Sequence, residues 1–218
     1  MDDKYMDLIA EENKEAYLWY IGNDKSNKNI PFGSHQPILI HLLNTITEGD
    51  VMEFGVGIHS TPIMHTICAQ QGRKLLSIDN DKEWFNPNEK YRTKDHEMNL
   101  FDNDKLLRCE YDFFNRNFAI IFVDAAPGPL RQFLIEKMKG HADYMIVHDT
   151  EEAIHPGFHK GHDVYNYDFS SFKHVLHFEK IMPATSVISD LDEIDKNILE
   201  IFKLENYEKI RKHSNARC

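Results

Sequence analysis

Short apolar segments alternate with helical segments along most of the chain. Apolar runs of strand length occupy residues 51–56, 74–79, 106–111, 118–124 and 144–149. The fourth run, F-A-I-I-F-V-D, is almost continuously apolar, which is typical of a central parallel strand buried on both faces. A helix is expected at residues 130–139, after a Pro-Gly-Pro turn. The alternation predicts a doubly wound α/β sheet with five parallel strands.

Two further strands are expected after the fifth one, at residues 173–179 and 184–189. The connection K-I-M-P between them is too short for a helical crossover, so they should pair antiparallel. Residues 86–105 contain few apolar side chains and much Asn, Asp and Lys. We expect that segment to be irregular, with room for one short helix.

Helix boundaries are indicated by capping residues. Ser34 is a credible N-cap for the helix that follows it, and Gly49 is expected to end that helix. Gly72 should close the helix that follows the first strand. Asp190 and Glu193 form a capping-box pattern at the start of a final amphipathic helix.

The chain is expected to form one domain, because its 218 residues with 41% hydrophobic content support a single sizeable core. We expect residues 1–34 to form a helical lid, residues 35–190 the α/β core and residues 191–218 a C-terminal helix. The single domain then spans residues 1–218.

Charge and composition narrow the classes of partner. The formal net charge is −11 and no basic stripe is present, which disfavours nucleic acid and anionic membranes. The three cysteines show no paired spacing, so we expect reduced thiols and no zinc cluster. The start, M-D-D-K-Y-M-D, lacks the apolar region of a signal peptide, and no apolar run approaches the ~20 residues needed to span a bilayer. A cytoplasmic location is expected.

A glycine turn follows the first strand in the segment V-M-E-F-G-V-G-I-H-S. Gly55 and Gly57 allow a sharp backbone turn and close approach of a ligand. Ser60 stands where dinucleotide-binding turns usually have a third glycine. Glu53 precedes Gly55 by two residues, where a carboxylate suits the ammonium group of a methionine moiety better than a pyrophosphate. Asp79 ends the second strand and is placed to accept hydrogen bonds from ribose hydroxyls.

This turn and the strand order resemble the class I S-adenosylmethionine-dependent methyltransferases, over roughly residues 35–190. The resemblance implies a Rossmann-like methyltransferase sheet with S-adenosylmethionine as cofactor. The positions that match the family's first motif are Glu53, Gly55, Gly57 and Ser60. Asp79 matches the ribose-binding acid, and Asp112, with Tyr111 beside it, matches the place where such folds hold the adenine ring.

A second cluster of polar residues is expected at the ends of the fourth and fifth strands. Asp124 ends one strand, and His148 and Asp149 end the other, so their side chains should converge at the carboxyl edge of the sheet. With His155 on the next loop, they can hold a divalent cation or provide an oriented general base. Asp124, His148 and His155 are therefore the candidate catalytic residues.

The cluster resembles that of family members that methylate hydroxyls with the help of a metal. In that branch, acidic residues at the positions of Asp124, His148 and Asp149 bind magnesium. His148 departs from the pattern, since an Asp or Glu is expected at its position. Magnesium prefers oxygen ligands, whereas imidazole suits later divalent metals. Three alternatives stay open: a manganese-like ion, His148 as a base without a metal role, or no metal at all.

The sequence therefore predicts an S-adenosylmethionine-dependent O-methyltransferase that acts on a small hydroxylated acceptor. Aromatic and polar residues in the loop at residues 155–170 favour a sugar or glycan as that acceptor. The first alternative is an NAD-type oxidoreductase on a Rossmann-like fold, since fold alone does not determine chemistry. The second alternative is a cofactor-binding module without activity.

Overall fold

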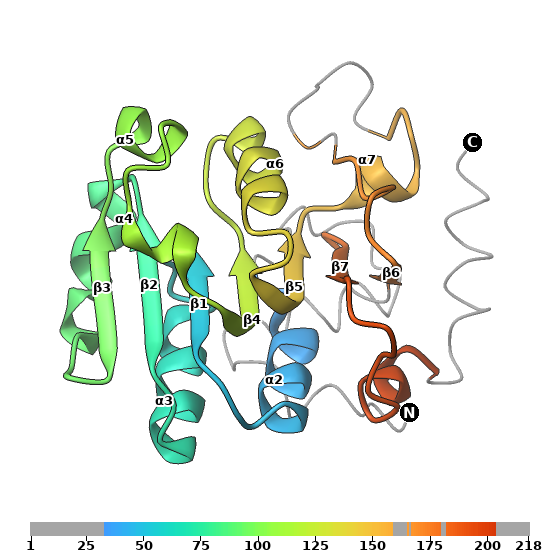
Figure 1. Ribbon diagram of the computed structural model, residues 1–218, viewed down its shortest axis with the longest axis horizontal. Helices are drawn as coiled ribbons and strands as arrows, with labels where there is room; N and C mark the ends of the chain where they lie inside the picture. The colour runs from blue at the N-terminus through green and yellow to red at the C-terminus, as the bar shows by residue number, and fades with distance from the viewer. Residues whose placement is uncertain (1–32, 159–164, 166, 180–181, 204–218) are drawn as a thin grey trace, which may run out of the picture.

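The computed structural model describes residues 33–158, 165, 167–179 and 182–203. A seven-stranded sheet of order β3-β2-β1-β4-β5-β7-β6 runs through the molecule. Its parallel strands are β1 (Val51–Phe54), β2 (Leu75–Asp79), β3 (His96–Leu100), β4 (Phe118–Val123) and β5 (Ala142–His148). All five run in the same direction, so their carboxyl ends lie side by side along what we call the carboxyl edge of the sheet (Figure 1).

The last two strands form an antiparallel pair, and the second of them runs opposite to the five parallel strands. β6 (His174–Phe178) pairs antiparallel with β7 (Thr185–Ser189), and β7 inserts antiparallel beside β5. The predicted doubly wound fold, with five parallel strands and an antiparallel C-terminal hairpin, is confirmed. Helices of both faces connect the strands: α2 (Gln36–Thr45), α3 (Thr61–Gln71), α4 (Lys82–Asn88), α5 (Asn103–Leu107), α6 (Gly128–Lys137) and α7 (Glu151–Ile154).

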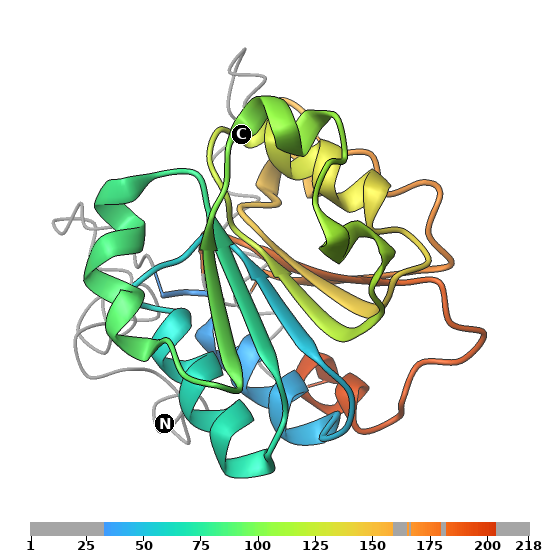
Figure 2. The same cartoon turned by 60° about the vertical axis from the view of Figure 1, so that its left-hand side comes forward.

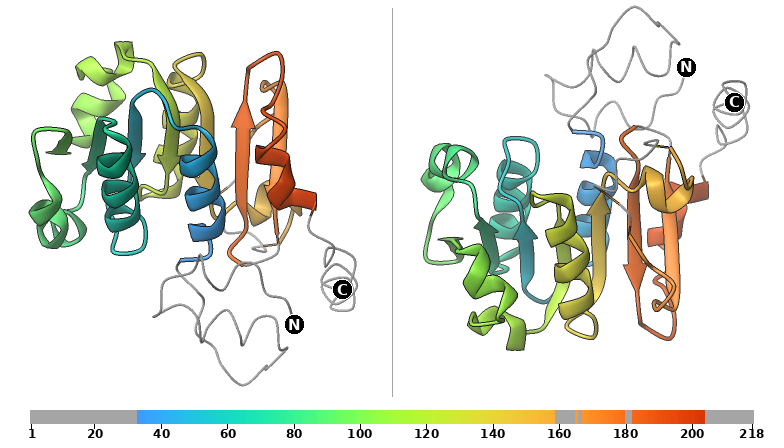
Figure 3. Two further views of the ribbon diagram at one scale, coloured as in Figure 1. Left: turned by 90° about the horizontal axis from the view of Figure 1, so that it is seen from below. Right: turned by 90° about the horizontal axis from the view of Figure 1, so that it is seen from above.

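Helices cover both faces of the sheet, as Figure 2 shows, and each face is packed by a hydrophobic layer. On one face, α2, α3 and the 3₁₀ helix η5 (Ile198–Lys203) pack their apolar residues against the strands. On the other face, α5, α6 and the 3₁₀ helix η3 (Asp112–Asn115) do the same. The two views of Figure 3 show α2 and α6 on opposite sides of the sheet.

Strand β4 joins both layers because successive side chains of a strand point to opposite faces. Ile121 and Val123 belong to the layer of α6, whereas Ile120 and Phe122 belong to the layer of α2. Each of these four side chains is at most 1% exposed. Burial of one such side chain contributes about 1.5–3 kcal/mol, so β4 is a main source of stability.

The predicted third strand at residues 106–111 is wrong. Strand β3 lies earlier, at His96–Leu100, and residues 103–107 form α5 instead. Only His96 and Met98 of β3 are buried, because β3 is an edge strand with one covered face. An edge strand of five residues therefore lacks the apolar run that marks the central strands, and the segment at residues 86–105 is more regular than expected.

Two of the predicted helix boundaries also differ from the structure. Helix α2 begins after His35 without a side-chain cap, and Ser34 directs its hydroxyl toward another partner. The helix ends at Thr45, and Gly49 lies in the following loop with φ +80°. Gly72 closes α3 as expected, in the left-handed conformation that favours glycine.

The predicted final helix is wrong where it is described. Residues 191–197 form bends and turns, and only η5 is helical. Asp190 does not act in a capping box, because its carboxylate accepts a hydrogen bond from the backbone N–H of Lys173 at 3.2 Å. The expected lid at residues 1–34 lies almost entirely outside the described residues. No described helix combines the length and apolarity needed to cross a membrane.

Candidate active site at the carboxyl edge of the sheet

The glycine turn after β1 lies directly against the end of β4. Gly55 has φ +97°, and a Cβ atom there would lie 2.5 Å from the carbonyl carbon of Asp124. The backbone N–H of Asp124 donates to the carbonyl of Phe54 at 2.7 Å. Gly57 has more space, since a Cβ atom there would meet only the hydroxyl of Ser60, at 3.6 Å. The structure thus brings the expected cofactor turn and Asp124 into contact.

Glu53 supports this turn from beneath. It is fully buried, and its carboxylate accepts hydrogen bonds from Ser60 Oγ at 2.6 Å and Thr61 Oγ1 at 3.0 Å. Burial raises the pKa of Glu53 to about 7, although the hydroxyls of Ser60 and Ser77 lower it. Glu53 is therefore only partly charged near neutral pH, and the structure gives it a role in shaping the turn rather than an exposed carboxylate.

Glu53→Gln is expected to reduce the dependence of stability on pH. In the unfolded chain the pKa of Glu53 is 4.5, so between that pH and about 7 the folded state binds the extra proton. Stability therefore falls as pH rises through this range, by roughly 3 kcal/mol. Denaturant unfolding at pH 5 and pH 8 should show that the free energy of unfolding falls less between these two pH values in the variant than in the wild type. The exposed Glu48→Gln serves as control, and equal pH dependence in all three proteins would contradict the prediction.

Asp79 links the end of β2 to the glycine turn. Its Oδ2 accepts from the backbone N–H of Val56 at 2.6 Å, and its Oδ1 accepts from that of Asp81 at 2.7 Å. The residue is 5% exposed, and burial raises its pKa despite these hydrogen bonds. Each carboxylate oxygen keeps a second lone pair, so ribose binding at Asp79 stays a prediction that the geometry permits.

The expected adenine-binding residues lie between α5 and β4. The ring of Tyr111 stacks on Phe113, with centroids 5.5 Å apart, and its hydroxyl accepts from the backbone N–H of Asp102 at 2.9 Å. Asp112 is exposed at the start of η3. Tyr111 packs against the core layer of α6. Their role toward adenine stays a prediction.

A buried guanidinium connects the two acidic residues of the second cluster. Arg131 of α6 is 4% exposed, and it forms ion pairs with Asp124 at 2.8 Å and with Asp149 at 2.8 Å. Burial alone raises the pKa of Asp124, but attraction to His148 and Arg131 outweighs it and holds that pKa below its usual range. Arg131 thus supplies a positive charge between Asp124 and Asp149, where the resemblance implied a magnesium ion.

His148 has hydrogen-bonding groups at both ring nitrogens. Its Nε2 lies 2.9 Å from Ser34 Oγ, and its Nδ1 lies 3.3 Å from Asp124 Oδ1 and 3.5 Å from Asp149 Oδ1. Burial lowers the pKa of His148, but Asp149 and Asp124 outweigh it and raise that pKa. The predicted convergence of Asp124, His148 and Asp149 is present, and the function of His148 as a base stays a prediction.

His155 lies apart from these contacts. Its Nε2 is 2.6 Å from Glu179 Oε2, and its side chain is 53% exposed. Two aromatic residues of the same loop region, Tyr167 and Phe169, stack on each other and are buried in the core layer of α6. These two rings are therefore not available to stack on a sugar. Residues 159–164 and 166 of the loop lie outside the described part of the chain.

Two residues of the site, Arg131 and His35, were not predicted from the sequence. Arg131 lies in the first turn of α6, after the loop that follows Asp124. Two acidic residues at neighbouring strand ends require a nearby positive charge. That signal was present in the sequence. His35 directly precedes α2, and its ring contacts that of His148 with centroids 4.7 Å apart, but neither periodicity nor spacing marks it in the sequence.

Comparisons with known proteins support the fold. No protein-family profile and no curated protein matches the chain. The O-methyltransferase TomG from Streptomyces achromogenes, involved in tomaymycin synthesis and solved with S-adenosylmethionine, is 13% identical with a TM-score of 0.53. An O-methyltransferase from Bacillus cereus, solved with S-adenosylhomocysteine, is 13% identical with a TM-score of 0.54. The methyltransferase PaMTH1 from Podospora anserina is 10% identical with a TM-score of 0.56.

These similarities extend over most of each chain. They cover 85%, 86% and 84% of this chain, and 93%, 96% and 89% of the TomG, Bacillus and Podospora chains respectively. The sequence identities are low, so the likeness concerns the arrangement of helices and strands. The chain has the α/β fold of the S-adenosylmethionine-dependent methyltransferases.

Proposed function

We propose that the protein is an S-adenosylmethionine-dependent O-methyltransferase that transfers a methyl group to a hydroxyl of a small polar acceptor. One observation carries the proposal. The backbone of Gly55, in the turn expected to hold the cofactor, lies against the backbone of Asp124, which belongs to the acid–histidine cluster. A cofactor bound at this turn would therefore lie beside a group that can accept a proton.

Sheet topology favours this function over an NAD-type oxidoreductase. The typical dinucleotide-binding sheet has strand order 3-2-1-4-5-6, whereas here the antiparallel β7 lies between β5 and β6. Ser60, at the place of the third glycine, donates to Glu53 and so forms part of the turn. The charge of Glu53 is a weaker argument against NAD than its sequence position suggested, because its pKa is raised to about 7.

Methyl transfer requires alignment of the acceptor and removal of its proton. S-adenosylmethionine, when bound, supplies an activated methyl group. Alignment alone contributes about 7–11 kcal/mol, and a general base adds about 10²–10⁴-fold. The side chain of Asp124 is 26% exposed and that of His148 is 5% exposed, so Asp124 is the more accessible member of the pair. We assign proton acceptance to the Asp124–His148 pair, in which His148, with its raised pKa, is the stronger base and Asp124 is the member more accessible to the acceptor.

The acceptor is proposed to be a small hydroxylated molecule, with a sugar or glycan as the finer proposal. The net charge of −11 opposes polyanionic acceptors such as nucleic acid. Phe158, in the loop after α7, is 52% exposed and offers a ring on which a sugar face could stack. His155 lies in the same loop, so its catalytic role depends on whether the loop approaches the acceptor.

Asp79→Ala is expected to weaken binding of S-adenosylmethionine at least about tenfold, because hydrogen bonds to a charged group contribute about 1.5–3 kcal/mol. Calorimetric titration measures this, with circular dichroism to verify folding. Asp143→Ala is the matched control, since Asp143 is an exposed residue near the start of β5, at the opposite edge of the sheet. Unchanged affinity in Asp79→Ala would remove Asp79 from the cofactor site.

A further inference from the structure

His35 is buried beside the candidate active site, and its ring lacks a well-formed hydrogen bond. It is 1% exposed, and within the described part of the chain neither ring nitrogen makes a hydrogen bond of ordinary geometry, although the backbone carbonyl of His59 lies close to the ring. Its ring lies against Phe122 and edge-on to His148, with centroids 4.7 Å apart in both cases. Buried polar groups are nearly always hydrogen-bonded, and the exceptions require an explanation such as an ion or a catalytic role.

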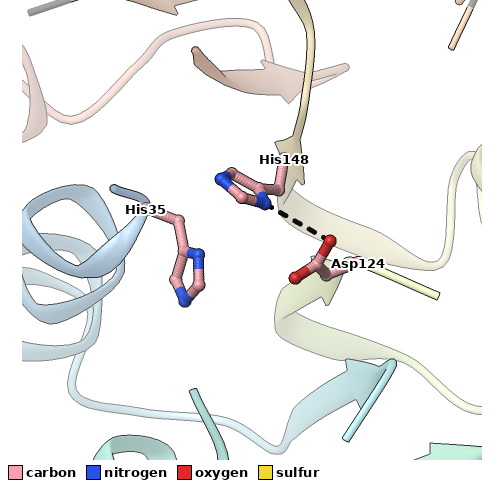
Figure 4. A group of neighbouring side chains, drawn as sticks. All are labelled: His35, Asp124 and His148. Atoms are coloured by element: carbon pink, nitrogen blue, oxygen red, sulfur yellow. Dashed lines mark hydrogen bonds and ion pairs between the residues drawn. The ribbon is translucent and has the colours of Figure 1, made fainter. Parts of the chain in front are cut away.

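Two further groups approach the same space. His35, Asp124 and His148 each offer one ligand atom, and these atoms all lie within 4.8 Å of one another. Figure 4 shows the three side chains converging, with the second carboxylate oxygen of Asp124 directed toward His35. Its first oxygen, Oδ1, already contacts Arg131 and His148. One carboxylate oxygen thus remains for a ligand on the side of His35.

The contacts of Ser34 determine which nitrogen of His148 faces this space. Ser34 Oγ donates to the carbonyl of Pro183 at 2.8 Å, so it accepts a hydrogen bond from Nε2–H of His148 at 2.9 Å. The Nδ1 atom then faces Asp124, and in the neutral ring it carries the lone pair. A ligating histidine typically donates its other N–H in this way, to a group that fixes its orientation.

We propose that His35, Asp124 and His148 bind a divalent transition-metal ion. Two imidazoles and one carboxylate suit manganese, iron, cobalt or zinc better than magnesium, which prefers oxygen ligands. Asp149 does not belong to this set, because its carboxylate is paired with Arg131 at 2.8 Å. The proposed set therefore differs from Asp124, His148 and Asp149, the ligands expected from the sequence.

Metal binding would draw the three side chains closer together. Ligand atoms at about 2.1 Å from one ion in tetrahedral geometry are about 3.4 Å apart, so a pair of atoms near the 4.8 Å limit would have to approach by about an ångström or slightly more. The catalytic meaning of the ion rests on the proposed function: bound to Asp124 and His148, it would replace their proton acceptance by lowering the pKa of the acceptor hydroxyl, whose proton would then pass to solvent. The existence of the site does not depend on that function.

Titration of metal-free, full-length protein with Co²⁺ tests the proposal through the visible absorption of the bound ion. We expect one Co²⁺ per chain, with an absorption spectrum of nitrogen and oxygen ligation, and no competition from equimolar Mg²⁺. His35→Phe and Asp124→Asn should each weaken Co²⁺ binding at least about tenfold. His35→Phe keeps a ring against Phe122 and removes only the ring nitrogens, so the metal-free variant should fold normally.

His141→Ala is the matched control, because His141 precedes β5 at the opposite end of the strand that carries His148. It should bind Co²⁺ as the wild type does. Absence of a Co²⁺ spectrum, or wild-type affinity in His35→Phe, would overturn the proposal. Calorimetry with S-adenosylmethionine on the metal-free protein separates this failure from a failure of the proposed function, because that titration requires no metal.

Discussion

Arg131→Met is expected to lower the free energy of unfolding by about 3–5 kcal/mol, because it breaks two buried ion pairs at once. Arg131 is 4% exposed and pairs with Asp124 and Asp149, both at 2.8 Å. Removal of the guanidinium leaves two carboxylates close together without their shared positive charge. It also removes hydrogen bonds to the carbonyls of Ala125 and His148, at 2.6 and 3.1 Å.

Denaturant unfolding at neutral pH measures this effect. Arg116→Met is the matched control, because Arg116 pairs with Asp50 and Glu97 near the surface at 3.5 and 3.4 Å. An exposed pair of this kind contributes about 0–1 kcal/mol, so the control should change little. Arg131→Lys should fall between the two, since a lysine keeps the charge but loses the planar fork. Similar losses in Arg131→Met and Arg116→Met would contradict the assigned role of Arg131.

Gly55→Ala is expected to destabilise the protein by roughly 2–5 kcal/mol and to abolish measurable binding of S-adenosylmethionine. Two effects combine. The backbone at Gly55 has φ +97°, which side-chain-bearing residues rarely adopt, and the new Cβ atom would lie 2.5 Å from the backbone of Asp124. Because backbone atoms of β4 cannot move aside cheaply, the glycine turn must shift away from the end of that strand.

Two control variants separate these effects. Gly72→Ala carries a positive φ of +68° but meets no atom within 4 Å, so it should show backbone strain alone and should leave cofactor binding intact. Gly57→Ala has ordinary contact with Ser60 at 3.6 Å and should destabilise less than Gly55→Ala. Unfolding and cofactor titration of all three variants measure the differences. Cofactor binding by Gly55→Ala at wild-type affinity would contradict the position assigned to the turn.

The central strands and the antiparallel C-terminal pair were predictable because their signals are local. Strand β4 is a run of six buried residues, and such a run occurs only where both faces of a strand are covered. The short K-I-M-P connection likewise required an antiparallel pair. The edge strand β3 was not predictable in this way, because only its covered face is apolar. The capping pattern at Asp190 failed because tertiary contacts gave that carboxylate a different partner.

The candidate site was predictable only in part. The edge of the sheet that carries Asp124 and His148 follows from strand direction alone. The contacts of Arg131 and His35 do not, because Arg131 lies in α6 and His35 directly precedes α2, and the positions of these two helices depend on packing across the whole core. Ser34 illustrates the same limit, since a plausible helix cap binds His148 instead. Long-range contacts of this kind leave no periodic trace in a sequence.

Calorimetric titration of the full-length protein with S-adenosylmethionine and, separately, with NAD⁺ tests the central claim most directly. The proposed function predicts that S-adenosylmethionine binds with one site per chain and that NAD⁺ produces no binding heat. Binding of NAD⁺ without binding of S-adenosylmethionine would contradict the proposal, as would the absence of heat from S-adenosylmethionine in a folded, full-length sample.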